Sequence, residues 1–263
     1  MKPMTNRYYK SLAKCGKVEG KIKRRSTTKE ENRSSVAESS KADYTILVEY
    51  STTEALSDDL DDAVSDIEGT ILAMTDNDEI EIGSLIATYF DAYAASATGY
   101  DLESALDEDA SLWETGTRLY DLNTGEFEFN EKVQHCLNHD ALLSNLLIID
   151  RLEIVPRFRG YGIGLGVMCK TMQHFGRDCG VITLRDSLLQ FDDCSQLSVA
   201  WFSAMGLDKP PKDEKRTEAI LARNYESLGF SKLPGTNVYV LCPAHTIPTI
   251  TQMKLPESSR YEI

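Results

Sequence analysis

The sequence has few of the residues that mark secreted, membrane-spanning or metal-binding proteins. It contains six cysteines, none in a C-x-x-C pair, and four histidines. Without a secretion signal, reduced thiols are expected rather than a disulfide framework. A metal cluster at His135, Cys136 and His139 would lack a fourth ligand, so no metal is expected. No segment approaches the roughly 18 apolar residues that cross a bilayer. A soluble, cytoplasmic protein without membrane contact is the expectation.

Basic residues are scarce outside the first part of the chain. The sequence has 28 Lys and Arg against 42 Asp and Glu, a net charge of −14. Of these, 12 basic and 4 acidic residues lie in residues 1–42, so this segment carries +8 and the remainder −22. Nucleic acid is therefore not expected as a partner, because phosphate contacts need clustered Lys and Arg. An acidic body keeps the protein soluble, and it also attracts cationic amines.

The chain divides into a tail and one domain. Residues 1–42 are polar and show no period, which predicts a disordered basic tail. Residues 43–263 form the expected domain, in which strands alternate with helices, so the class is α/β (α+β) with a mixed, mostly antiparallel central sheet flanked by helices. The predicted strands are Tyr44–Tyr50, Gly69–Met74, Ile80–Tyr93, Leu146–Ile154, Gly180–Leu184 and Val238–Leu241. The predicted helical segments are residues 58–62, 101–140, 165–175, 195–205 and 213–228.

A glycine-rich segment, residues 156–166, lies between the expected strand Leu146–Ile154 and the helix that follows. Glycines let a backbone approach a ligand and adopt positive φ without steric cost. Successive N–H groups in such a turn form an anion-binding nest, and a helix N-terminus adds about half a positive charge. Arg157 and Arg159 add full charges. The segment therefore predicts a diphosphate site, with a merely structural turn as the alternative.

The spacing of the glycines argues against two common phosphate-binding motifs. The dinucleotide fingerprint G-x-G-x-x-G fails, because its last position is Leu165 counted from Gly160 and Val167 counted from Gly162. A P-loop string is absent, as is the downstream Asp/Asn set of protein kinases. A nucleotide-binding protein of another class is thus the weaker interpretation.

Two strings resemble motifs of the GNAT N-acetyltransferase superfamily. The segment Ile154–Gly164 matches V-x-P-x-x-[QR]-x-x-G-x-[GA], with Ile154 in the place of Val, Pro156 as the Pro and Arg159 as the Gln or Arg. Near the C-terminus, residues 224–230 (NYESLGF) are similar to the family pattern YexLGF. Together the motifs and the elements between them cover about residues 144–242, and residues 44–143 follow the family order only loosely.

The resemblance implies a GNAT-like acyl-CoA N-acyltransferase fold and an enzyme that moves an acetyl group from acetyl-CoA to an amine of a small molecule or peptide. Backbone groups of Leu152, Glu153 and Ile154 would pair with the pantetheine arm. Tyr225 would protonate the leaving sulfur, since an ordinary tyrosine is protonated at neutral pH. Family members often dimerise, so a homodimer is left open. The pyrophosphate would be held by Arg159, Gly160, Tyr161, Gly162, Ile163 and Gly164.

Some positions depart from the family pattern. Histone-acetylating members carry a Glu base where this chain has Ile148, and Asp150, two residues on, is the candidate base. The Asn that many members carry before the Tyr is replaced by Glu218. A non-catalytic, acyl-CoA-binding regulatory or interaction protein is therefore the alternative. An acidic rim on the acceptor side, or equally a solvated loop, is formed by Asp186, Gln190, Asp192 and Asp193.

Overall fold

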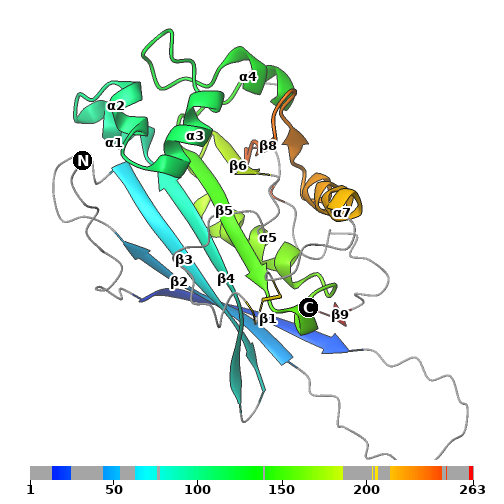
Figure 1. The fold of residues 1–263 in the computed structure, drawn as a ribbon. Coiled ribbons are helices and arrows are strands. Elements are labelled where there is room, and N and C mark those ends of the chain that lie inside the picture. Colours follow the sequence, from blue (N-terminus) through cyan, green and yellow to red (C-terminus); the bar gives the residue numbers. More distant parts are fainter. Residues whose placement is uncertain are drawn as a thin grey trace, which may run out of the picture.

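The structure is an α+β fold built on one open sheet whose strands run mostly antiparallel (Figure 1). The computed structural model describes residues 14–24, 44–53, 63–75, 78–138, 140–185, 203, 205–206, 214–244, 247 and 261–262. Within these residues nine strands follow the order β7-β8-β6-β5-β4-β3-β2-β1-β9. Only β5 and β6 are parallel. The predicted class, a mixed and mostly antiparallel sheet with helices, is confirmed.

The strands are β1 Lys14–Arg24, β2 Tyr44–Thr53, β3 Val64–Met74, β4 Glu79–Phe90, β5 Leu146–Ile154, β6 Val181–Arg185, β7 Ser231–Lys232, β8 Val238–Leu241 and β9 Tyr261–Glu262. The helices are α1 Ala92–Ala97, α2 Leu102–Leu106, α3 Ala110–Leu119, α4 Glu131–Leu137, α5 Ile163–Phe175 and α7 Glu214–Ser227, with a 3-10 turn η2 at Pro156–Phe158. The predicted strand at Leu146–Ile154 and the strand at Val238–Leu241 have the predicted bounds.

The first strand lies inside the segment that was predicted to be a disordered tail. Strand β1 pairs with β2 in an antiparallel ladder that runs from Lys14 opposite Ser51 to Ile22 opposite Tyr44. The composition of residues 1–42 hides a short alternation of charged residues with Val18, Gly20 and Ile22. Alternation with period two suits a strand, and its pairing with β2 supplies the partner that the segment lacks alone.

Strand β4 is shorter than predicted, because a helix begins where the strand was expected to continue. Its last residue is Phe90, and the side chain of Asp91 accepts hydrogen bonds from the amides of Tyr93 and Ala94. This N-cap satisfies donors that a new helix leaves without a partner. The predicted helical segment 101–140 is divided into α2, α3 and α4, and its buried leucines lie on α2 and α3: Leu102, Leu106, Leu112 and Leu119.

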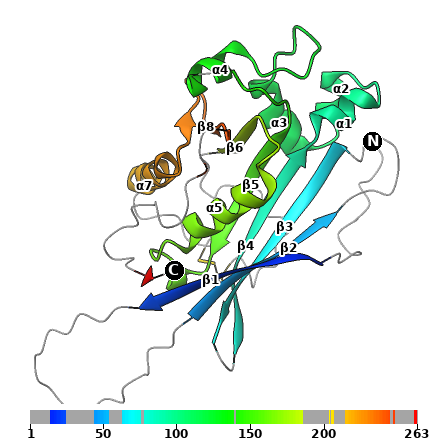
Figure 2. The same cartoon turned by 180° about the vertical axis from the view of Figure 1, so that it is seen from behind.

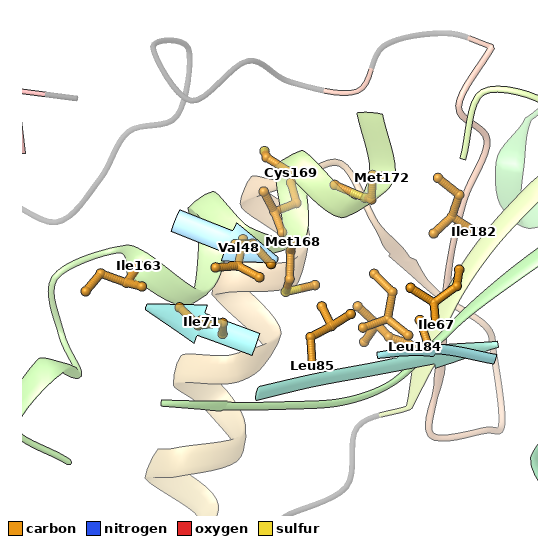
Figure 3. Packing of buried hydrophobic residues seen from close by; sticks show 14 of the residues in the cluster. Val48, Ile67, Ile71, Leu85, Ile163, Met168, Cys169, Met172, Ile182 and Leu184 are labelled. Atoms are coloured by element: carbon orange, nitrogen blue, oxygen red, sulfur yellow. The ribbon is translucent and has the colours of Figure 1, made fainter. Parts of the chain in front are cut away.

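Two apolar clusters cover the two faces of the sheet. The α5-side core joins helix α5 to β2, β3, β4, β5 and β6, and Figure 3 shows Met168 and Met172 of α5 directed at it. The α3-side core lies on the opposite face beneath α1 to α4 and includes Phe90, Leu112 and Ile148. Figures 1 and 2 show α5 on one face of the sheet and α1 to α4 at one end of the other. The strand β5 is thus covered from both sides.

Candidate functional site

The site is built where the parallel pairing of β5 with β6 ends, a place that we call the fork. The two strands pair in parallel from Leu146 opposite Val181 to Ile149 opposite Leu184. Strand β5 then continues to Ile154, while β6 ends at Arg185 and remains paired with β8. Among the described residues, no strand pairs with the β6-side edge of β5 beyond Ile149. In this part of the chain, the β6-side backbone groups of β5 beyond Ile149 therefore have no strand partner.

A β-bulge lies at the start of the fork. Ile86 and Ala87 are adjacent in β4, but they pair with Arg151 and Ile149, so Asp150 is the extra residue of β5. A bulge changes the face of the sheet on which the following side chains lie. Before it, Ile149 packs in the α5-side core; after it, Ile154 does. The shift of one residue puts Glu153 on the same face as Asp150, the face opposite α5.

The backbone of β5 alternates between β4 and the fork. The amide of Val155 donates to the carbonyl of Ile82 at 2.8 Å, so residue 155 faces β4. By the strand period Glu153 also faces β4, whereas Leu152 and Ile154 direct their backbone groups into the fork. Of the three residues expected to pair with pantetheine, Leu152 and Ile154 have backbone groups on the fork side. The backbone of Glu153 does not, because it belongs to the ladder with β4 opposite Ser84.

The side chain of Glu153 is buried in an ion pair. It is 2% exposed, and its Oε1 accepts a hydrogen bond from Nε of Arg151 at 2.5 Å. Removing one partner from a buried pair leaves an uncompensated charge, so such pairs hold each other in place. Glu153 is thus part of the support beneath the fork.

The glycine loop connects this edge to helix α5, and several of its backbone amides have no acceptor among the described residues. Gly160 and Gly162 have φ of 78° and 75°, the left-handed region that glycine adopts without strain. Gly162 is the N-cap of α5 and no side chain caps the helix. The amide of Gly166 donates to Gly162. Within the described part of the chain, no hydrogen bond uses the amides of Gly160, Gly162, Ile163, Gly164 or Leu165.

Arg159 differs from the role expected for it. Its own amide donates to Pro156, its Nε to the carbonyl of Ile154 at 2.6 Å, and its Nη2 to the carbonyl of Met205 at 2.7 Å. Burial lowers the pKa of the guanidinium, and the charge of Glu153 opposes this effect. Arg159 therefore braces the end of β5 against the turn at Met205, and its amide is not one of those available to a diphosphate.

Asp150, the candidate base, lies half-buried at the bulge. Its Oδ2 accepts a hydrogen bond of 2.9 Å from Oγ1 of Thr88 on β4, and its Oδ1 accepts one from Oγ of Ser111 on α3. Because both contacts come from the α3 side, Asp150 occupies the face of the sheet opposite α5. Sequence reasoning missed Thr88 and Ser111, which carry no motif and lie 62 and 39 residues from Asp150.

Tyr225, the candidate acid, lies on the other face at the same level. Its half-buried ring packs edge-on against Tyr239 of β8, with 5.2 Å between the centroids, in the α5-side core. Tyr239 pairs with Leu184, and Leu184 pairs with Ile149. This row across three strands ends beside Asp150. The structure thus places the two candidates on opposite faces at the level of the fork, with the strands of the row between them.

Other predicted features fall outside the described residues, namely the acidic run 58–62, the rim at Asp186, Gln190, Asp192 and Asp193, and most of the helix 195–205. Glu218 is exposed on α7. In the described part, no group of three His, Cys, Asp or Glu side chains could hold a metal ion, and His139 of the possible cluster is not included there. No described helix is both long and apolar enough to span a bilayer.

Comparisons of the chain with protein-family models, with curated proteins and with solved structures found no match.

Proposed function

We propose that this protein is an N-acetyltransferase of the GNAT type, which transfers an acetyl group from acetyl-CoA to an amine of a small molecule or peptide. The observation that carries the proposal is the junction of the fork with the glycine loop. Among the described residues, no strand pairs with the edge of β5 at Leu152 and Ile154, and this edge leads directly to amides around Gly162 that have no acceptor in the same part of the chain. One ligand that carries both an amide-containing arm and a diphosphate matches this sequence of groups, and acetyl-CoA is such a ligand.

The loop suits the diphosphate for electrostatic reasons. The amides of Gly162, Ile163 and Gly164 belong to the first turn of α5, a helix of 13 residues. The positive end of the helix dipole stabilises an anion there, and amides bind phosphate oxygens without the ordering cost of long side chains. Gly164 has no Cβ to block approach, and a Cβ at Gly160 would meet no atom within 4 Å.

The edge of β5 suits the pantetheine arm. Arg159 already occupies the carbonyl of Ile154. The carbonyl of Leu152 and the amide of Ile154 are then the adjacent acceptor and donor on the fork side of β5. An amide of the arm would add to them as a strand adds to a sheet edge, a mode of recognition in which main-chain hydrogen bonds supply affinity.

The acceptor amine would approach from the α3 side, where Asp150 lies. Asp150 takes a proton from the ammonium, and the nitrogen lone pair attacks the thioester carbonyl carbon. The tetrahedral intermediate collapses as the C–S bond breaks, and the sulfur takes a proton from the Tyr225 hydroxyl. The second proton of the nitrogen returns to the Tyr225 phenolate, and Asp150 releases the proton that it took to water. An acetylated amine, free CoA and one released proton result. Binding of the amine and of acetyl-CoA at the fork brings the amine close to the thioester. Asp150 then acts as the base and Tyr225 as the acid.

The test has two stages. Isothermal titration of the full chain with acetyl-CoA, and with acetyl-pantetheine, which lacks the diphosphate, should show binding that depends on the diphosphate. Thiol release from acetyl-CoA is then measured with a panel of amines, aminoglycosides and peptides, with mass spectrometry of the product. Absence of binding overturns the proposal. Binding without turnover favours a non-catalytic acyl-CoA-binding protein with regulatory or interaction roles.

A further inference from the structure

Asp150 is held from two directions by residues that no sequence motif marks. Ser111 donates from the first turn of α3, and Thr88, which is 4% exposed, donates from β4. We propose that Ser111, together with Thr88, is a positioning residue that fixes the carboxylate of Asp150 as the base of the acetyl transfer. This inference rests on the proposed function and adds residues to it.

The bulge explains why the carboxylate needs such support. Asp150 is the extra residue of β5, opposite no residue of β4, and the ladder does not hold it as it holds its neighbours. Two hydroxyls that bind different oxygens restrict rotation of the carboxylate about its terminal torsion, which is broad in the absence of partners. A base must stay within hydrogen-bond reach of the proton that it takes.

The position of Ser111 on its helix fits this role. Asp109 caps α3 by accepting from the amide of Leu112, so the first turn of the helix has its own capping residue. The Ser111 hydroxyl is therefore not required as the cap and is directed at β5. Its bond to Asp150 joins the α3 layer to the fork, 39 residues away in the chain. The hydroxyl acts on the base and not on the helix start.

If Ser111 positions the base, its removal should slow only those acceptor amines that need a base. Loss of a purely structural contact should slow all acceptors equally. An alkylamine is mostly protonated at pH 7.5 and needs the base, whereas hydroxylamine is mostly neutral and does not. We expect Ser111→Ala to lower kcat for an alkylamine by about tenfold, within the hundredfold or more that a general base contributes. For hydroxylamine we expect little change, and the KM for acetyl-CoA should not move. Ser111→Thr, which keeps the hydroxyl, should restore most of the rate.

The chain offers a matched control and a second arm. Ser104 donates to the carboxylate of Asp101 at 3.0 Å on α2, so Ser104→Ala removes the same kind of bond elsewhere and should leave both amines unaffected. Thr88→Val removes the other hydroxyl with little change in shape, and it should reproduce the amine-dependent loss if Ser111→Ala folds poorly. In an Asp150→Asn background, Ser111→Ala should cause no further loss, because the residues act through one group.

The outcomes separate this inference from the function on which it rests. The inference alone is overturned if kcat falls equally for both amines, or if Ser111→Ala lowers kcat further in the Asp150→Asn background. Either result would give Ser111 and Thr88 a purely structural role. Wild-type protein that transfers no acetyl group to any amine overturns the proposed function and the inference together. Selective loss with the alkylamine, rescued by Ser111→Thr, supports both.

Discussion

Gly164 stands over the side chain of Leu152: a Cβ atom added to Gly164 would lie 3.6 Å from Cδ2 of Leu152, an ordinary van der Waals distance. The start of helix α5 and the fork edge of β5 are therefore in contact, with room for one methyl group between them. A ligand that uses both must pass over this contact.

Replacing Gly164 with alanine should separate folding from binding. The methyl group fits without overlap and alanine favours the helix, so the free energy of unfolding should stay the same or rise. The same methyl stands beside the amide that is expected to meet the diphosphate, and we expect the Kd for acetyl-CoA to rise by about tenfold, or 1.4 kcal/mol. Chemical denaturation and isothermal titration measure the two effects. Unchanged affinity would place the diphosphate elsewhere.

Gly162→Ala should lower stability and binding together. Its φ of 75° is left-handed, and a residue with a Cβ is disfavoured there by about 1–2 kcal/mol. Gly125 is a matched control, because it has a φ of 68° and no atom within 4 Å of an added Cβ. We expect Gly125→Ala to lose similar stability in urea unfolding while its affinity for acetyl-CoA is retained. Equal loss of affinity in both variants would contradict a specific role for the loop.

Arg159→Lys should destabilise the fold although the charge is kept. Lysine cannot bind the carbonyls of Ile154 and Met205 with the planar geometry of a guanidinium. A hydrogen bond to a charged group contributes about 1.5–3 kcal/mol, so the free energy of unfolding should fall by about that amount. Arg157, whose guanidinium lies over the ring of Phe158 at 5.0 Å, serves as control, since Arg157→Lys should change stability little. Lost affinity at unchanged stability would instead make Arg159 a direct phosphate ligand.

Stability should fall in alkaline solution partly because of Tyr89. Burial, followed by the nearby charges of Cys179 and Asp91, raises the pKa of Tyr89 to about 12. An unfolded tyrosine titrates near pH 10. Because the pKa of Tyr89 is higher in the folded state, its contribution to the free energy of unfolding is complete below about pH 10 and is lost as the pH rises through about 12. Urea unfolding at pH 8 to 11.5 should therefore show a shallower decline for Tyr89→Phe than for the wild type; parallel curves would refute the assignment.

Local patterns predicted most elements, and the reason is that their information lies in near neighbours. The apolar run Leu146–Ile154 ends at Pro156, and the glycines that follow mark the turn into α5. The spacing of apolar residues in a strand or a helix indicates which of its faces is buried, without indicating which element packs against that face. The bounds of β5 and β8 could therefore be predicted without knowledge of the sheet order.

The arrangement of the site needed contacts between distant parts of the chain. Whether Glu153 shares a face with Asp150 depends on the register of β5 against β4, and nothing near Asp150 in the sequence announces a bulge. The brace from Arg159 to Met205 spans 46 residues. The strand β1 was missed because its pairing with β2 is also non-local.

The sequence by itself determined the class of fold, a strand followed by a glycine turn and a helix, and with them a place where an anion would be stabilised. The tertiary structure alone decided which groups at that place have partners within the protein. There the amide of Arg159 donates to Pro156, Glu153 is buried, and Asp150 accepts hydrogen bonds from two hydroxyls. The physical reason is that backbone conformation follows mainly from nearby residues, whereas the partner of a polar group is selected by packing between segments that lie far apart in the chain.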